Sequence, residues 1–213
     1  MWPWEHLAVG YLCYSLSVRL SGRGAPRPWP VIALAVGTQF PDLVDKPLAW
    51  TVGVLPSGHS LAHSLFVALP VAALAVSVGA ALGRRRGGTA RGRDDAARDD
   101  SHAGAAFALG YLSHLPGDAF YPALVGSEPN YDFLLWPVVP VPASETSVGF
   151  AEMVRLLLGR YVERLARGEL SPYLAVELGL LASVLALWVA DGLPPLRWLW
   201  SRVVLGRPAE ESP

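Results

Sequence analysis

The chain has 213 residues, of which 52% are hydrophobic and only 16% are charged. An ordinary soluble domain carries about 25% charged residues, so this shortage of charge argues against a disordered chain and predicts a membrane protein. The formal net charge of -1 gives no overall field that attracts a nucleic acid, and the single cysteine, Cys13, excludes an internal disulfide framework.

Apolar runs follow one another along the whole chain. They cover residues 6–18, 29–40, 64–82, 103–115 and 173–189. The third and fifth approach the roughly 20 residues that cross a hydrocarbon core, and the shorter runs contain glycine and alanine, which allow close helix contact. The pattern predicts an all-α fold, an integral membrane helical bundle of about five spans that forms a single domain over residues 1–200. The alternative is a soluble all-α protein that buries the same helices.

The arginines indicate how such a bundle is oriented. Most of them follow the first, third and fifth runs, at positions 19, 23, 27, 84–86, 91, 93, 98, 197, 202 and 207. Because cytoplasmic loops are rich in Lys and Arg, this distribution predicts an N-terminus outside and a C-terminus inside a plasma or inner membrane. Segment 84–102 is predicted to be a charged flexible linker, and 201–213 a polar C-terminal tail.

Segment 152–170 has a different pattern, with leucines near helical spacing and most of its charged residues elsewhere on the helix. Such a pattern is typical of an amphipathic helix. We expect this helix to lie on the membrane surface or to cap the bundle.

Ionisable side chains stand at the ends of the first four runs. They are His6, Asp42, Asp45, His59, His63, His114 and Asp118. If the runs alternate in direction, all seven gather at the outer end of the bundle. Charged groups at membrane depth are costly, so their presence predicts a functional site.

The spacing of these residues favours a metal site. His59 and His63 are four residues apart, as are His114 and Asp118, so each pair shares one face of a helix. Imidazole with carboxylate favours Zn, or Mn or Fe, and the number of candidate ligands allows one or two ions.

Each of these residues also has a simpler interpretation. His6 and His59 fit interfacial polar positions, Asp42 fits a helix cap, and Asp45 fits an ion pair with a basic group such as Lys46. His114 and Asp118 fit a hydrogen-bonded pair without metal.

The sequence resembles the YdjM-like family of membrane-bound, predicted metal-dependent hydrolases. The resemblance lies in His6, in GTQFPDLVD at 37–45, in His63 followed by Ser64, and in GYLSHLPGD at 110–118. It covers roughly residues 1–120 and implies a ligand set similar to that of zinc-dependent phospholipase C enzymes. The acidic pair is spaced PDLVD where the family has PDxD, and His59 lies one residue nearer to His63 than the family pattern places it.

These features together predict a membrane-bound hydrolase that uses a metal-activated water to attack a phosphoester or another ester, in a small molecule or a lipid. Asp45 or Asp118 is the expected general base if it is not a metal ligand. The alternative is a transporter or a non-catalytic membrane protein that uses the same cluster to bind an ion. The expected surroundings are the lipid bilayer, and the sequence leaves the oligomeric state open.

Overall fold

The computed structural model describes residues 1–86, 91–143, 148–168 and 171–203, and it describes the backbone but not the side chains at 86, 91–100 and 202. The described residues form helices and contain no strand. The helices are α1 (Pro3–Leu20), α2 (Pro28–Pro47), η1 (Leu48–Val52), α3 (Leu65–Arg86), α4 (Arg91–Leu124), η2 (Asp132–Leu135), α5 (Phe150–Ala166), α6 (Pro172–Ala190) and α7 (Leu196–Val203). The predicted all-α fold class is therefore confirmed.

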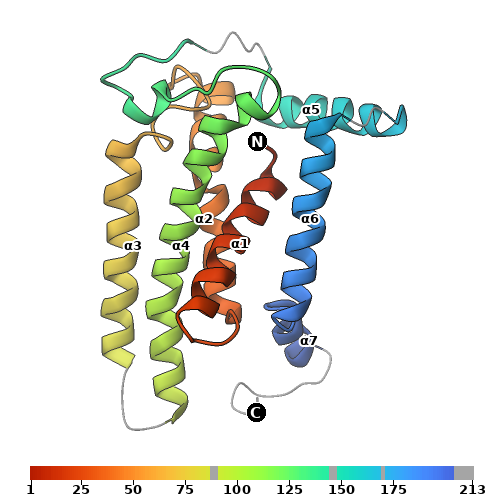
Figure 1. Ribbon diagram of the computed structural model, residues 1–213. Helices are drawn as coiled ribbons and strands as arrows, with labels where there is room; N and C mark the ends of the chain where they lie inside the picture. The colour runs from red at the N-terminus through yellow and green to blue at the C-terminus, as the bar shows by residue number, and fades with distance from the viewer. Residues whose placement is uncertain (87–90, 144–147, 169–170, 204–213) are drawn as a thin grey trace.

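Helix α4 lies beside α3 and α2, and glycines make these close contacts possible (Figure 1). A Cβ atom at Gly37 would lie 2.2 Å from the carbonyl oxygen of Phe107, and one at Gly104 would lie 2.2 Å from that of Ala75. Any larger residue at these positions would push the helices apart. The small residues therefore set the distance between α2, α3 and α4.

Two helices are long and apolar enough to cross a membrane, over Leu65–Arg85 and Pro172–Ala190, by length and composition within the described residues. They correspond to the two longest apolar runs. Most of their side chains lie outside the protein core, since only 17% and 11% of the respective windows are buried. The structure thus supports two candidate spans, and a bundle of about five spans stays a prediction.

The segment predicted as a linker, 84–102, contains the end of α3 and the beginning of α4, with 87–90 outside the described residues. The segment predicted as an amphipathic helix, 152–170, contains most of α5, which crosses one end of the bundle (Figure 1). Of the predicted tail 201–213, only 201–203 are described, as the end of α7.

A buried carboxylate joins α6 to α1 near the C-terminal end of both helices. Asp191 accepts hydrogen bonds from Tyr11 at 2.7 Å and Ser15 at 2.6 Å, and it forms an ion pair with Arg19. Asp191 therefore makes a structural contact between α1 and α6. From the sequence alone, its position also suits an ordinary residue at the membrane interface.

Candidate metal centre

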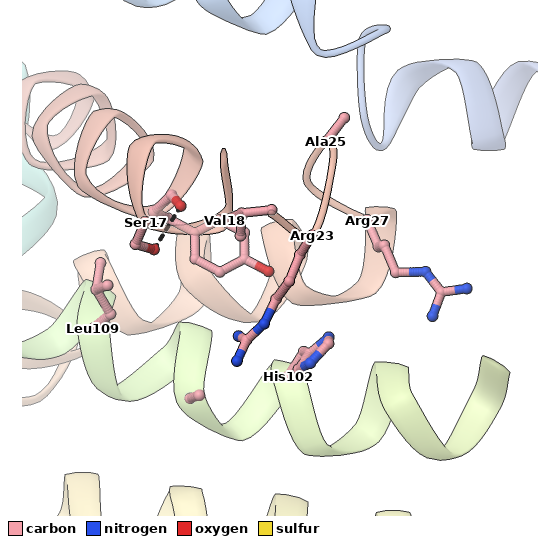
Figure 2. A pocket seen from close by; sticks show the side chains of 9 residues that line it. Ser17, Val18, Arg23, Ala25, Arg27, His102 and Leu109 are labelled. Atoms are coloured by element: carbon pink, nitrogen blue, oxygen red, sulfur yellow. Dashed lines mark hydrogen bonds between the residues drawn. The ribbon is translucent and has the colours of Figure 1, made fainter. Parts of the chain in front are cut away.

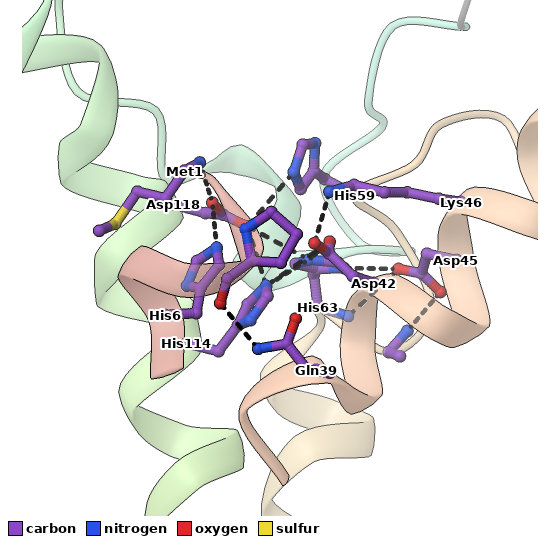
Figure 3. A network of polar contacts seen from close by, with 12 residues as sticks. Met1, His6, Gln39, Asp42, Asp45, Lys46, His59, His63, His114 and Asp118 are labelled. Atoms are coloured by element: carbon purple, nitrogen blue, oxygen red, sulfur yellow. Dashed lines mark hydrogen bonds and ion pairs between the residues drawn. The ribbon is translucent and has the colours of Figure 1, made fainter. Parts of the chain in front are cut away.

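Four of the predicted residues converge at the end of the bundle where α1 and α6 begin (Figure 3). Asp42 comes from the last turns of α2, and His63 from the turn that precedes α3. His114 and Asp118 come from α4, which continues as a helix through Pro116 and so keeps both side chains on one face. The alternating helix directions predicted from the sequence bring these residues together.

The four side chains approach one another at distances that suit a single cation. His63 Nε2 lies 3.1 Å from His114 Nε2 and 3.3 Å from Asp118 Oδ2, while His114 Nε2 lies 3.0 Å from Asp118 Oδ2. Asp42 Oδ1 completes the group at 3.5 Å from His63 Nε2. In a tetrahedral Zn site with bonds of about 2.1 Å, the ligand atoms lie about 3.4 Å apart. The quoted separations are near this value, and all four ligand atoms lie within 4.8 Å of one another, so the group could hold such a cation after small side-chain shifts.

Two carboxylate oxygens of this group make no hydrogen bond. Asp42 Oδ1 and Asp118 Oδ2 are buried, and neither has a hydrogen-bond partner. Burying a carboxylate oxygen without a partner is costly, so each needs a proton or a cation. Because both oxygens face the two imidazole Nε2 atoms, one bound cation satisfies all four groups at once.

Hydrogen bonds on the far side of each imidazole ring orient it for this role. The Nδ1 atom of His63 donates to Asp45 Oδ2 at 2.8 Å, and the Nδ1 atom of His114 donates to the carbonyl of Thr38 at 2.7 Å. We assign these tautomers because both partners are acceptors. Each ring then presents an unprotonated Nε2 to the centre, as metal-binding histidines do.

Asp45, which was predicted as a ligand or a general base, lies outside the group of four. Its two oxygens also accept hydrogen bonds from the backbone N–H groups of Ser60 and Ala62, both at 2.8 Å. Asp45 is completely buried. It therefore holds the turn that carries His63 as well as the His63 ring.

His6 and His59 flank Asp118 without joining the group of four. His6 Nε2 lies 3.2 Å from Asp118 Oδ1, and the His6 ring stacks on His114 with centroids 3.6 Å apart. His59 Nε2 lies 3.3 Å from Asp118 Oδ2, and its side chain is 40% exposed. Every member of the group of four is buried, so His59 marks the exposed edge of the site.

Lys46 belongs to the site but was not predicted to. It donates a hydrogen bond to Asp42 Oδ2 at 2.5 Å, so the ammonium group of Lys46 pairs with Asp42 and not with Asp45. The spacing of four residues on α2 is the signal that sequence reasoning missed. The amino group of Met1 is a further neighbour, at 2.8 Å from Asp118 Oδ1.

A second set of buried polar contacts fixes the first turn of α1, which carries His6. Tyr173 donates a hydrogen bond to Glu5, and Trp4 and Tyr161 donate to Glu177 Oε1 at 2.7 and 3.0 Å. Burial and the hydrogen bond to Glu177 raise the pKa of Tyr161 to about 12, so this phenol remains a donor at neutral pH. Helices α5 and α6 thereby hold α1 in place beside the site.

A cavity of about 120 Å³ lies elsewhere, between α4 and the connection from α1 to α2 (Figure 2). Arg23, Arg27 and His102 are among the residues that line it, and none of the seven predicted site residues is. The metal candidates and this cavity are therefore separate features.

Comparisons with known proteins identify the family. A family model described as YdjM inner membrane protein matches residues 1–193. Searches of curated proteins and of solved structures find no match. The similarity to zinc-dependent phospholipase C stays a prediction. With nearly its whole length matched, and with the predicted motif residues together at one end of the bundle, the chain belongs to the YdjM inner membrane protein family, which gives it an inner membrane location.

Proposed function

We propose that this protein is a membrane-bound, metal-dependent hydrolase that acts on a phosphoester or another ester. The observation that carries the proposal is the convergence of Asp42 Oδ1, His63 Nε2, His114 Nε2 and Asp118 Oδ2, two of which are buried oxygens without a partner. The chemistry that a divalent cation supplies in such a site is activation of water for attack on an ester.

The surroundings of the cluster favour catalysis over a purely structural ion. A structural site needs only its four ligands, and here His6, His59 and Lys46 also contact the ligating carboxylates. His6 beside Asp118 Oδ1 offers the start of a second cation position, so the proposal includes one or two ions, with Zn first and Mn or Fe next.

The residues have distinct roles in this proposal. Asp42, His63, His114 and Asp118 bind the ion, and Asp45 positions His63. His59 is the group nearest to an approaching substrate, because its ring is the exposed part of the site. The oxygens of Asp45 are already occupied by donors, so of the two predicted residues Asp118 is the candidate general base, for a site in which Asp42, His63 and His114 alone hold the ion.

The proposed topology has about five spans, formed by α1, α2, α3, α4 and α6, with the metal site outside and the C-terminus inside. The site lies at the end of the bundle where α1 and α6 begin. In the proposed arrangement that end is at the level of the lipid headgroups. That position suits a substrate drawn from the membrane or from its surface.

The test is elemental analysis of the detergent-purified protein, followed by assays with a water-soluble phosphodiester and with a phospholipid, each with and without chelator. We expect bound Zn, hydrolysis that the chelator abolishes, and loss of both in His63→Ala with His114→Ala. His102→Ala is the matched control, since this histidine lines the distant cavity.

Two outcomes would contradict the proposal. Absence of metal above background in the unaltered protein would remove its basis. Metal-dependent uptake into vesicles without turnover of any ester would favour the ion-binding transporter instead.

A further inference from the structure

Helix α5 carries an apolar stripe that the rest of the protein does not cover. None of its residues is buried, and Val154, Leu158 and Leu165 each expose 43% of their surface. Their spacing places the three side chains on one face of the helix. An apolar stripe of this kind marks an interaction surface.

The protein holds α5 at two points and leaves that stripe open. Near its start, the Phe150 ring stacks on Trp50 with centroids 6.1 Å apart, and the Phe150 N–H donates to Thr51 Oγ1 at 3.0 Å. Farther along, Tyr161 donates to Glu177. The helix crosses the end of the bundle and extends past α6 (Figure 1).

The position of α5 indicates which partner covers its stripe. Helix α6 is a candidate span, and Val176 and Leu178 in its second turn expose 58% and 48% of their surface. Exposed apolar side chains on a span face lipid chains. Because α5 lies across the beginning of α6, its stripe is at the boundary between acyl chains and headgroups.

The charges of α5 fit the same partner. Arg155 pairs with Glu152, and Arg167 pairs with Glu163. Arg160 and Arg164 make no ion pair with any residue that the structure describes, and they stand one helical turn apart. The helical spacing places both arginines on the polar side of α5, away from the stripe. On a helix that lies at a membrane surface, arginines of the polar side extend toward lipid phosphates.

We propose that α5 lies in the plane of the membrane surface, with its apolar stripe among the lipids and with Arg160 and Arg164 in contact with anionic headgroups. This inference goes beyond the proposed hydrolase and does not depend on a metal. Since Tyr161 also packs against Trp2 with ring centroids 5.0 Å apart, the surface helix sets the height of the neighbouring α1 turn relative to the headgroups.

The test uses fluorescent labels at single cysteines in a Cys13→Ser background, in protein reconstituted into vesicles of phosphatidylcholine and phosphatidylglycerol with brominated acyl chains. We expect Leu158→Cys to lose most of its fluorescence to the bromines. Glu163→Cys on the polar face, the matched control, keeps its fluorescence.

A second arm tests the headgroup contact. Bromine on phosphatidylglycerol quenches the Leu158→Cys label more than bromine on phosphatidylcholine, and Arg160→Gln with Arg164→Gln removes this difference. Arg155→Gln, whose arginine is paired with Glu152, preserves it. Equal quenching at Leu158 and Glu163, or disulfide cross-linking of Leu158→Cys between two copies, overturns the proposal.

Discussion

Both ends of the helical bundle bury carboxylates, but the hydrogen bonding of these carboxylates differs between the two ends. Asp191 accepts hydrogen bonds from Tyr11 and Ser15 and forms an ion pair with Arg19, so the protein itself supplies donors and a positive charge for this carboxylate. At the other end, one oxygen of Asp42 and one of Asp118 are buried without a hydrogen-bond partner.

The difference separates a structural contact from a candidate binding site. A buried carboxylate with its own donors stabilises the contact between helices, whereas carboxylate oxygens that lack a hydrogen bond and lie beside two imidazole nitrogens need a proton or a cation. Four substitutions distinguish the two ends further, beginning with the largest expected effect.

Asp118→Ala removes a carboxylate that contacts both histidines of the group of four. We expect the bound metal to be lost, together with any increase in melting temperature that added Zn gives to the unaltered protein. Elemental analysis and thermal unfolding with added Zn measure this. Retention of full metal content would mean that the ion lies elsewhere.

Asp191→Ala leaves two buried hydroxyl donors without an acceptor and Arg19 without its partner. We expect a loss of about 3 kcal/mol in the free energy of unfolding, reduced by the partial exposure of Arg19 to water. Denaturant unfolding in detergent measures it, while the metal content stays unchanged. A loss of metal in this variant would show that the two ends are coupled.

Asp45→Asn keeps the shape of the side chain but weakens its hold on the His63 ring. Loss of such an orienting carboxylate lowers metal affinity by about 10- to 100-fold. Competition with a chelator of known affinity gives this value. An affinity as low as that of Asp118→Ala would instead identify Asp45 as a ligand.

Gly10→Ala tests the packing between the two ends. Its Cβ would lie 2.5 Å from Thr38 Cγ2, on a buried side chain that must shift, so we expect a loss of about 1–2 kcal/mol in unfolding free energy. Gly159→Ala is the control, because no atom lies within 4 Å and the helix gains propensity. If Gly10→Ala and Gly159→Ala both lowered the unfolding free energy, the loss would not be specific to the contact with Thr38.

The helical class could be predicted from the sequence, and the seven candidate residues chosen from it include the four that converge. Apolar runs of helical length leave few alternatives to helices, and histidines or aspartates at their ends are too costly to be incidental. The alternation of directions was enough to place His63, His114, Asp42 and Asp118 at one end.

The contacts that distinguish these residues from one another depend on the packing of the helices. Spacing along the chain treated Asp42 and Asp45 alike, yet Asp42 faces the centre while Asp45 accepts backbone N–H groups from the turn before α3. Which of the two aspartates faces the centre depends on how the turn before α3 folds against α2. The spacing of three residues between Asp42 and Asp45 carries no information about that contact.

The remaining contacts were beyond sequence reasoning for the same physical reason. The carbonyl of Thr38 orients His114 from a different helix, and a backbone atom has no signature in the sequence. The separation of α2 from α4 that makes this contact possible depends on where Gly37 meets the Phe107 carbonyl. The residue types and their spacing are enough to name the candidate ligands. Which of their atoms meet depends on helix packing, and packing depends on contacts between segments far apart in the chain.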